Sequence, residues 1–177
     1  MNQPDLTFPE ALSRSHDRAS FNCGTAELND YFHTRVSQHI KSRITRCFVV
    51  IDRANEDKVA GFYTIPAAGV PFETLDRHPA GAAMVRGFPR YQLPVFLMGR
   101  LAVDIAYRDY RPKLRLGESL LFDAIERCME SDVAGFALIV DAKPDAEGFY
   151  RKYNFVNYTS EPLKLILAFP KIKNLPA

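Results

Sequence analysis

The sequence has no run that approaches the roughly 20 apolar residues a membrane-spanning helix requires. Its first residues, Met1 to Asp5, also lack the basic region and apolar run of a secretory signal. Cysteine is scarce, and Cys23, Cys47 and Cys128 show neither CxxC spacing nor a pairing with histidine that suits zinc. These absences predict a cytoplasmic protein with no membrane anchor, disulfide framework or metal site.

An excess of charge of one sign is also missing, since the formal net charge is only +2. A value so close to zero does not by itself require a polyanionic partner. The distribution is less even, because the segment from His33 to Val50 contains no acidic residue. Its basic side chains form a cluster: Arg35, Lys41, Arg43 and Arg46. Two interpretations of this basic cluster are open: a solvated face, or a surface that contacts the phosphate backbone of a nucleic acid.

Repeats, low-complexity tracts and Gly/Ser linkers are absent as well. A chain of 177 residues with 47% hydrophobic residues is long enough for one well-packed core and too short for two ordinary domains. We therefore expect a single domain over residues 1–177.

Periodicity in the first half predicts a helical segment followed by a hairpin. Residues 26–42 place apolar side chains near helical spacing, which predicts one helix, or two with a break near Thr34. Residues 45–51 and 59–65 are rich in β-branched and aromatic residues, which predicts an antiparallel hairpin. Prolines and scattered glycines make residues 66–92 irregular, apart from a short helix around 72–77.

The second half alternates between strand and helix patterns. Strands are expected at 95–103, 136–140, 155–159 and 163–169. A helix is expected at 117–130, and a second one at 145–153 follows Pro144. This order predicts an α/β domain with a mixed sheet and crossover connections.

Four motifs stand in order along the chain: residues 21–32 (Phe-Asn-Cys-Gly-Thr-Ala-Glu-Leu-Asn-Asp-Tyr-Phe), 61–64 (Gly-Phe-Tyr-Thr), 98–104 (Met-Gly-Arg-Leu-Ala-Val-Asp) and 149–155 (Phe-Tyr-Arg-Lys-Tyr-Asn-Phe). With them, residues 8–169 resemble the GNAT N-acetyltransferases, and within these the acetylating toxins of bacterial toxin–antitoxin pairs. The resemblance implies the GNAT fold, with a mixed central sheet of about six to seven strands flanked by about four helices.

The toxins of this branch acetylate the free α-amino group of aminoacyl-tRNA and so stop translation. The resemblance therefore implies acetyl-coenzyme A as donor, aminoacyl-tRNA as acceptor, a ribbon-helix-helix antitoxin as partner, and a homodimer. The basic cluster then supplies candidate contacts to the tRNA backbone. An α-amino group titrates at about pH 8 and needs little help from a base. This suits a sequence whose four histidines we expect to be solvated rather than catalytic.

The loop expected to hold the pyrophosphate of coenzyme A departs from the family pattern Arg/Gln-x-x-Gly-x-Gly/Ala. Residues 111–117 read Arg-Pro-Lys-Leu-Arg-Leu-Gly, so only the last glycine is kept. Two interpretations are open: the cations of Arg111, Lys113 and Arg115 contact phosphate where the family uses backbone, or the pocket is degenerate. The candidate cofactor-binding residues are Leu101, Ala102, Val103, Arg111, Lys113, Leu114, Arg115, Leu116, Gly117, Glu118 and Asp141.

Tyr150 is the candidate catalytic residue, because it matches the tyrosine that in many GNAT enzymes protonates the departing thiolate. A phenol is neutral at pH 7 and can donate a proton. Asn154 replaces the glycine of this motif, and we expect it to serve as a left-handed helix cap. Backbone N–H groups of Leu101 to Val103 are candidates to stabilise an oxyanion. Arg100, on an apolar strand, needs a partner if it is buried, so it is either an ion-paired structural residue, which we favour, or a contact to ligand.

The leading hypothesis is thus an acetyl-coenzyme A-dependent toxin that acetylates aminoacyl-tRNA. Two alternatives remain. The first is a GNAT acetyltransferase of a small amine or a protein N-terminus, in which the basic cluster is only a solvated face. The second is a GNAT-like binding module whose altered loop impairs acyl-coenzyme A binding.

Overall fold

The computed structural model describes residues 3–108 and 115–171. The chain divides into two compact units. Unit 1 comprises Met1–Pro66 and Met98–Arg127, and unit 2 comprises Ala67–Leu97 and Cys128–Ala177. Each unit contains one β-sheet, and the two sheets have four and five strands. None of the helices in the described ranges is long and apolar enough to cross a membrane.

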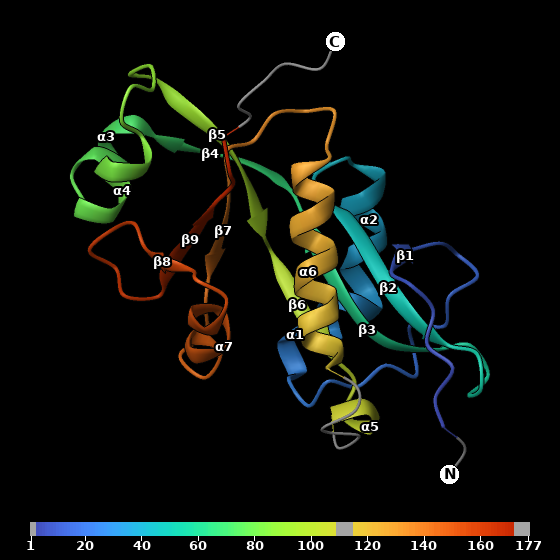
Figure 1. Cartoon of the computed structure of the whole chain (residues 1–177). Helices are drawn as coiled ribbons and strands as arrows, with labels where there is room; N and C mark the ends of the chain where they lie inside the picture. The colour runs from blue at the N-terminus through green and yellow to red at the C-terminus, as the bar shows by residue number, and fades with distance from the viewer. Residues whose placement is uncertain (1–2, 109–114, 172–177) are drawn as a thin grey trace. The chain divides into compact units, whose positions relative to one another are not determined.

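The sheet of unit 1 is antiparallel and contains the predicted hairpin (Figure 1). Its strands, in spatial order, are β1 (Glu10–Ala11), β2 (Arg46–Asp52), β3 (Lys58–Ile65) and β6 (Arg100–Val103). The register pairs Phe48 with Tyr63 and Asp52 with Lys58. Buried aliphatic and aromatic residues fill both faces of β2 and β3, because helices cover both faces.

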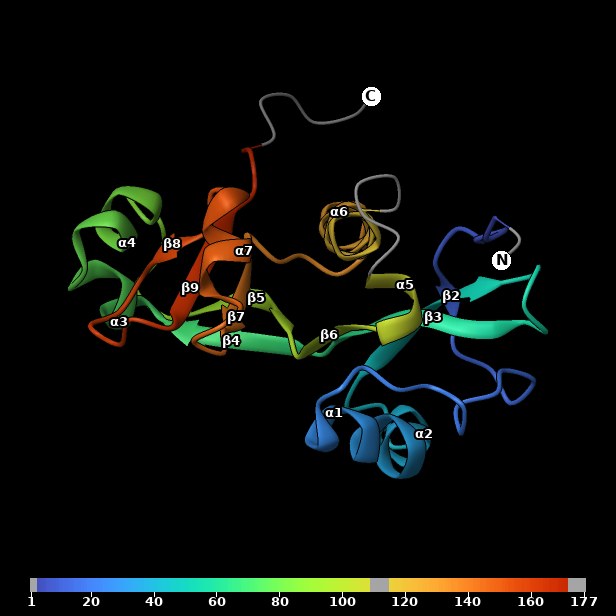
Figure 2. The ribbon, with the colours of Figure 1, turned by 90° about the horizontal axis from the view of Figure 1, so that it is seen from below.

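Figure 2 shows these helices on opposite faces of β2 and β3. One face carries α1 (Ala26–Asp30), the π-helical segment η1 (Tyr31–Arg35) and α2 (Val36–Lys41), and the other carries α6 (Leu116–Met129). The helical run predicted for residues 26–42 is confirmed, and near Thr34, where a break was one of the two options, the chain continues as the π-helical segment. Arg18 stabilises it, because its guanidinium donates to the carbonyl oxygens of Phe32 (3.1 Å) and His33 (3.3 Å).

The prediction of one strand over residues 95–103 is wrong. The chain leaves β5 (Gln92–Met98), passes Gly99 and enters β6, which belongs to the other sheet. The Gly99 N–H donates to the Thr64 carbonyl at 3.0 Å, and a Cβ on Gly99 would lie 2.9 Å from Thr64 Oγ1. Opposite this point, Pro66 separates β3 from β4 and has no N–H to continue the ladder. The chain therefore passes from one sheet to the other at two facing points, at Pro66 between β3 and β4 and at Gly99 between β5 and β6.

The sheet of unit 2 has the spatial order β4-β5-β7-β9-β8. Besides β5, its strands are β4 (Ala67–Pro71), β7 (Ala137–Asp141), β8 (Val156–Asn157) and β9 (Lys164–Ala168). Its helices are α3 (Phe72–Asp76), α4 (Pro79–Met84) and α7 (Glu147–Lys152). Residues 66–92 are thus more regular than expected. Their prolines stand where no N–H is needed, Pro71 before the first turn of α3 and Pro79 in the first turn of α4.

The α/β class is confirmed, whereas the element counts differ from expectation. The described ranges hold nine strands and seven α-helices, instead of about six to seven strands and four helices. Most of the excess is short, since β1 and β8 have two residues each and α5 (Ile105–Arg108) has four. Elements of this length carry no periodicity that a sequence pattern could reveal.

Gly61 of β3 determines how closely α6 approaches the sheet. A Cβ there would lie 2.9 Å from Leu120 Cδ1 and 3.1 Å from the carbonyl oxygen of Ala102. We expect Gly61→Val to lower the free energy of unfolding by about 1–3 kcal/mol, because the core is overpacked. Gly148→Ala in α7, where an added Cβ meets nothing within 4 Å, is the matched control and should be neutral or stabilising. Urea unfolding measures both, and equal effects would contradict the packing argument.

Candidate active site

Strand β6 carries Leu101, Ala102 and Val103 and is an edge of its sheet in the part of the chain that the structure describes. The Asp104 N–H donates to the Ala60 carbonyl of β3 at 2.9 Å. In an antiparallel ladder, hydrogen-bonded and non-hydrogen-bonded residue pairs alternate. Ala102 lies two residues before Asp104, so its N–H also faces β3. The N–H groups of Leu101 and Val103 then point to the open edge. This edge can pair with an extended ligand that has amide groups, such as a pantetheine arm.

Arg100, at the start of β6, has no ion pair with any residue that the structure describes. Its guanidinium lies over the ring of Tyr31, 3.4 Å from the ring centroid. The Tyr31 hydroxyl is in turn 3.3 Å from His39 Nδ1. Contact with a π-face replaces a counter-ion for a half-buried guanidinium, so Arg100 anchors β6 to η1 by a cation–π interaction.

Helix α6 presents its N-terminus directly after the altered loop. Among the described residues, the Ser119 N–H donates to the Arg115 carbonyl at 2.9 Å. The N–H groups of the first turn of an α-helix have no partner within the helix itself. Such a terminus attracts an anion. Of the predicted loop residues, Arg111, Lys113 and Leu114 lie outside the described residues.

Arg115, in contrast, is described and solvent-exposed. Its side chain is 72% exposed and lies 3.4 Å from Glu118 Oε2, and Leu116 and Gly117 begin the helix beside it. An exposed ion pair at this distance contributes little to stability. Arg115 can therefore exchange its contact with Glu118 for one with a phosphate. Asp141, the last predicted cofactor residue, is exposed at the end of β7.

Tyr150 lies in the last turn of α7, which ends in a Schellman motif. Asn154 has φ 65°, and its N–H donates to the Arg151 carbonyl at 3.1 Å. The N–H of Phe155 donates to the Tyr150 carbonyl at 3.3 Å, and the rings of Tyr150 and Phe155 are in edge contact with centroids 5.4 Å apart. The left-handed cap predicted for Asn154 is confirmed. It orients the Tyr150 side chain through both backbone and ring contacts.

The ring of Tyr150 is buried among aromatic side chains. The residue is 6% exposed, and burial raises its pKa to about 12. In residues 3–108 and 115–171 the Tyr150 hydroxyl has no hydrogen-bond partner, and Phe149 and Phe155 flank the ring. The phenol is therefore neutral throughout the physiological pH range, and its proton remains available for a reacting group.

Asn154 allows a direct test of the cap. We expect Asn154→Ala to lower the free energy of unfolding by about 1 kcal/mol, because alanine tolerates a positive φ less well. Asn154→Gly, which adopts this conformation freely, should leave stability within about 0.5 kcal/mol of the original protein. Thermal unfolding compares the two variants. A loss of stability in Asn154→Gly equal to that in Asn154→Ala would show that the amide side chain matters rather than the backbone conformation.

The expectation that the four histidines are solvated is wrong for most of them. His33 Nε2 lies 2.8 Å from the Phe21 carbonyl, His16 Nε2 lies 2.9 Å from Glu10 Oε1, and His39 contacts Tyr31. His78 Nδ1 is buried without a hydrogen-bond partner in the described part of the chain. His16, His33 and His39 thus connect segments of the chain through their imidazoles.

The predicted basic cluster is exposed along its whole length. Arg35 pairs with Asp30 at 2.8 Å, whereas Lys41, Arg43 and Arg46 extend from α2 to the start of β2. Within the described ranges, no group of three or more His, Cys, Asp or Glu residues could hold a metal ion.

Sequence reasoning missed Asp104, the last residue of the motif at 98–104. Its side chain is fully buried, and Oδ2 accepts from the Asn22 N–H at 2.8 Å. Oδ1 accepts from the Ala106 N–H at 2.9 Å and lies 3.3 Å from Lys58 Nζ. Asp104 thus joins the end of β6, the motif at 21–32 and the first turn of α5. The only available signal was its place at the end of an apolar strand.

The order of these elements defines the class of protein. An edge strand (β6), a helix (α6), a buried strand (β7) and a short helix that carries Tyr150 (α7) follow one another along the chain, which is the series that the resemblance to GNAT acetyltransferases implies. The chain has the GNAT fold, as comparison with known proteins shows.

No protein-family model matches the sequence. The chain is 24% identical over 170 residues to the probable toxin TacT of Sinorhizobium fredii (strain NBRC 101917 / NGR234), covering 90% of this chain and 89% of the relative. A solved structure of AtaT complexed with acetyl-methionyl-tRNAfMet matches with a TM-score of 0.77 and 24% identity, over 93% of this chain and 95% of AtaT. A tyrosine-to-phenylalanine variant of the AtaT toxin, bound to the C-terminus of the antitoxin AtaR and to acetyl-coenzyme A, matches with a TM-score of 0.70 and 23% identity, over 93% of each chain. The resemblance to the toxin branch is confirmed.

Proposed function

We propose that this protein is an acetyl-coenzyme A-dependent N-acetyltransferase, a toxin that acetylates the α-amino group of aminoacyl-tRNA and so blocks translation. The observation that carries the proposal is Tyr150, a buried, neutral phenol whose position is fixed by the Schellman motif of α7. The fold supports it, because AtaT has been solved with acetyl-methionyl-tRNA and AtaT's variant with acetyl-coenzyme A.

The reaction uses few groups of this chain. The neutral α-amine attacks the thioester carbonyl, a C–N bond forms, and the carbonyl oxygen becomes an oxyanion that the N–H groups of Leu101 and Val103 stabilise. When the C–S bond breaks, the thiolate takes the proton of Tyr150. The new amide nitrogen loses a proton to solvent, and Tyr150 regains one. Because an α-amine titrates at about pH 8, no dedicated base is required.

Coenzyme A is proposed to lie along β6 and against the N-terminus of α6. The pantetheine amides pair with the open edge of β6, and the pyrophosphate takes the N–H groups of the first turn of α6. Arg115 supplies charge in place of the missing glycines, together with Arg111 and Lys113. Leu114, Leu116, Gly117, Glu118 and Asp141 complete the proposed set.

The proposed substrate also defines the surroundings of the protein. Aminoacyl-tRNA is used in translation, so the enzyme acts in the cytoplasm. A ribbon-helix-helix antitoxin is the proposed protein partner, supported by the AtaR complex of AtaT. We further propose a homodimer in which residues 1–177 of each chain form one GNAT domain.

The test is transfer from radiolabelled acetyl-coenzyme A to a set of acceptors. Methionyl-tRNA, deacylated tRNA, methionine amide and a peptide with a free N-terminus are compared. Label should enter only the aminoacyl-tRNA and be released as N-acetylmethionine when the ester is hydrolysed. Labelling of the amide or the peptide alone would favour the small-amine or N-terminal enzyme. Calorimetry that detects no acetyl-coenzyme A binding would favour the binding module.

A further inference from the structure

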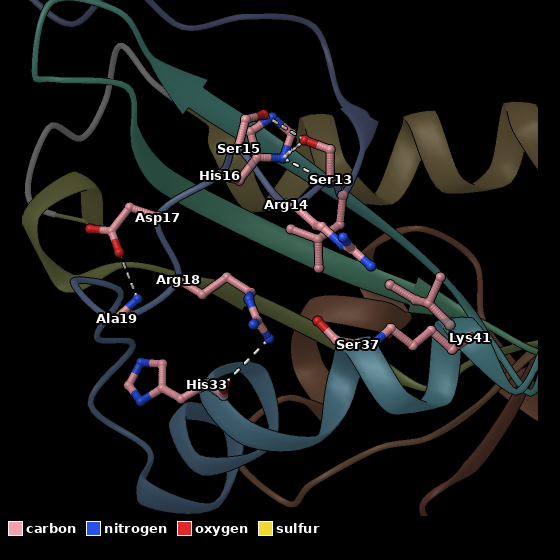
Figure 3. Close-up of a pocket in the computed structure, with 12 residues that line it drawn as sticks. Ser13, Arg14, Ser15, His16, Asp17, Arg18, Ala19, His33, Ser37 and Lys41 are labelled. Carbon is pink, nitrogen blue, oxygen red and sulfur yellow. Dashed lines mark hydrogen bonds between the residues drawn. The ribbon is translucent and has the colours of Figure 1, made fainter.

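An open groove of about 770 Å³ lies in unit 1, away from the predicted site residues except Lys41. Its walls are the loop that precedes the first sequence motif and the helical segment η1–α2 (Figure 3). The lining residues are Leu12, Ser13, Arg14, Ser15, His16, Asp17, Arg18, Ala19, His33, Ser37, Ile40 and Lys41. We call this feature the loop groove.

Cations from both walls meet in the loop groove. Figure 3 shows Arg14 extending from the loop toward α2, which carries Ser37 and Lys41, whereas the guanidinium of Arg18 is joined to the backbone of His33. Arg14 and Lys41 are exposed, and neither has an ion pair within residues 3–108 and 115–171. The one acidic lining residue, Asp17, turns away to accept from the Ala19 N–H at 2.9 Å. The groove therefore presents positive charge that no carboxylate of the described chain neutralises.

The other lining residues indicate which kind of anionic ligand the loop groove can bind. Ser13, Ser15 and Ser37 add hydroxyl donors, which together with Arg and Lys are the side chains that bind phosphate oxygens. The lining includes no Phe, Tyr or Trp on which a base could stack, and its aliphatic side chains are those of Leu12, Ala19 and Ile40. A peptide ligand would require larger apolar pockets for its anchors. The combination suits a sugar–phosphate backbone.

We propose that the loop groove binds the phosphate backbone of the tRNA substrate, with Arg14 and Lys41 as direct contacts. This inference rests on the proposed function and deepens it. Lys41 belongs to both the groove and the basic cluster, so the tRNA-binding surface extends from Arg43 and Arg46 across α2 to the loop at 12–19. Arg18 has a positioning role, because its bonds to the η1 carbonyls hold one wall.

The experiment measures binding of fluorescently labelled, deacylated tRNA by anisotropy at several salt concentrations. Arg14→Ala and Lys41→Ala should each weaken binding about 3- to 10-fold at about 0.1 M salt. Each should also lower the slope of log K against log salt by about 1, and the double variant by about 2. Arg86→Ala, which removes an exposed cation in unit 2, is the matched control and should change neither value. Arg18 is not replaced, since its loss would disturb η1.

The outcomes separate the two proposals. If the original protein neither binds tRNA nor acetylates aminoacyl-tRNA, both the proposed function and the assignment of tRNA to the groove are overturned. If the original protein does both and the variants keep its affinity and salt slope, only the groove assignment is overturned. If the variants keep tRNA affinity but lose affinity for a polyglutamate peptide, the groove binds acidic peptides instead. Unchanged acetyl-coenzyme A binding in the variants excludes a general folding defect.

Discussion

Tyr150→Phe should lower kcat for acetyl transfer by a factor of about 10²–10⁴, the range expected when a general acid is lost. The substitution removes one hydroxyl and keeps the ring, so the edge contacts with Phe149 and Phe155 remain. The hydroxyl has no hydrogen-bond partner in the described part of the chain, and its loss should change the free energy of unfolding by less than about 1 kcal/mol. The defect should therefore appear in catalysis and not in folding.

Two controls isolate the acid role. Tyr158→Phe alters another buried tyrosine of unit 2, whose pKa burial also raises to about 12, and it should keep full activity. Acetyl-coenzyme A affinity, measured by calorimetry, should be the same for the original protein and both variants. Because the pKa of Tyr150 is about 12, its ionisation should not affect kcat between pH 7 and pH 10. Activity of Tyr150→Phe close to that of the original protein would exclude Tyr150 as the acid.

Features that depend on residues close in sequence were predicted well. The hairpin of β2 and β3 follows from two β-rich segments and the turn between them. The cap at Asn154 follows from its place four residues after Tyr150, within a single helical turn. In both cases the deciding interactions join residues that a sequence pattern displays together.

Features that depend on distant partners were not predicted. The apolar run at 95–103 looks continuous, and its division at Gly99 follows from contact with Thr64, 35 residues earlier. Arg100 has the charge expected of an ion-paired residue, but its partner is the ring of Tyr31. Similarly, His33 contacts the Phe21 carbonyl and His39 contacts the Tyr31 hydroxyl, partners that lie 12 and 8 residues earlier in the chain. Tertiary contact, and not local propensity, decides these positions.

The loop groove could not be predicted from the sequence either, because it too depends on residues that are distant along the chain. Arg14 and Lys41 are far apart along the chain, and an isolated arginine before the first motif carries no signal by itself. Only the folded chain brings the loop beside α2. Asp104 was visible in its motif, but its role follows from Asn22 and Lys58, which the strand pattern does not include.

Asp104→Ala should be the most destabilising substitution described for this chain, with a loss of about 3–5 kcal/mol in the free energy of unfolding. The change leaves Lys58 without its carboxylate and the N–H groups of Asn22 and Ala106 without their acceptor. Unsatisfied buried donors each cost about 1–3 kcal/mol. For a chain of this size the melting temperature should fall by roughly 6–20 °C. Asp132→Ala, at an exposed carboxylate, is the matched control and should stay within about 0.5 kcal/mol.

Asp104→Asn tests whether this anchor also serves the cofactor. Asparagine keeps the shape and one acceptor oxygen, so the variant should fold, but its amide nitrogen is a donor that faces other donors. Asp104 directly follows β6, whose N–H groups are proposed to bind the cofactor, and it holds the first turn of α5. The bond from Ile105 N to the Asn22 carbonyl at 2.9 Å further ties α5 to the motif at 21–32. We expect acetyl-coenzyme A affinity to fall several-fold in Asp104→Asn at temperatures where the variant remains fully folded by circular dichroism. Affinity equal to that of the original protein would show that Asp104 serves stability alone.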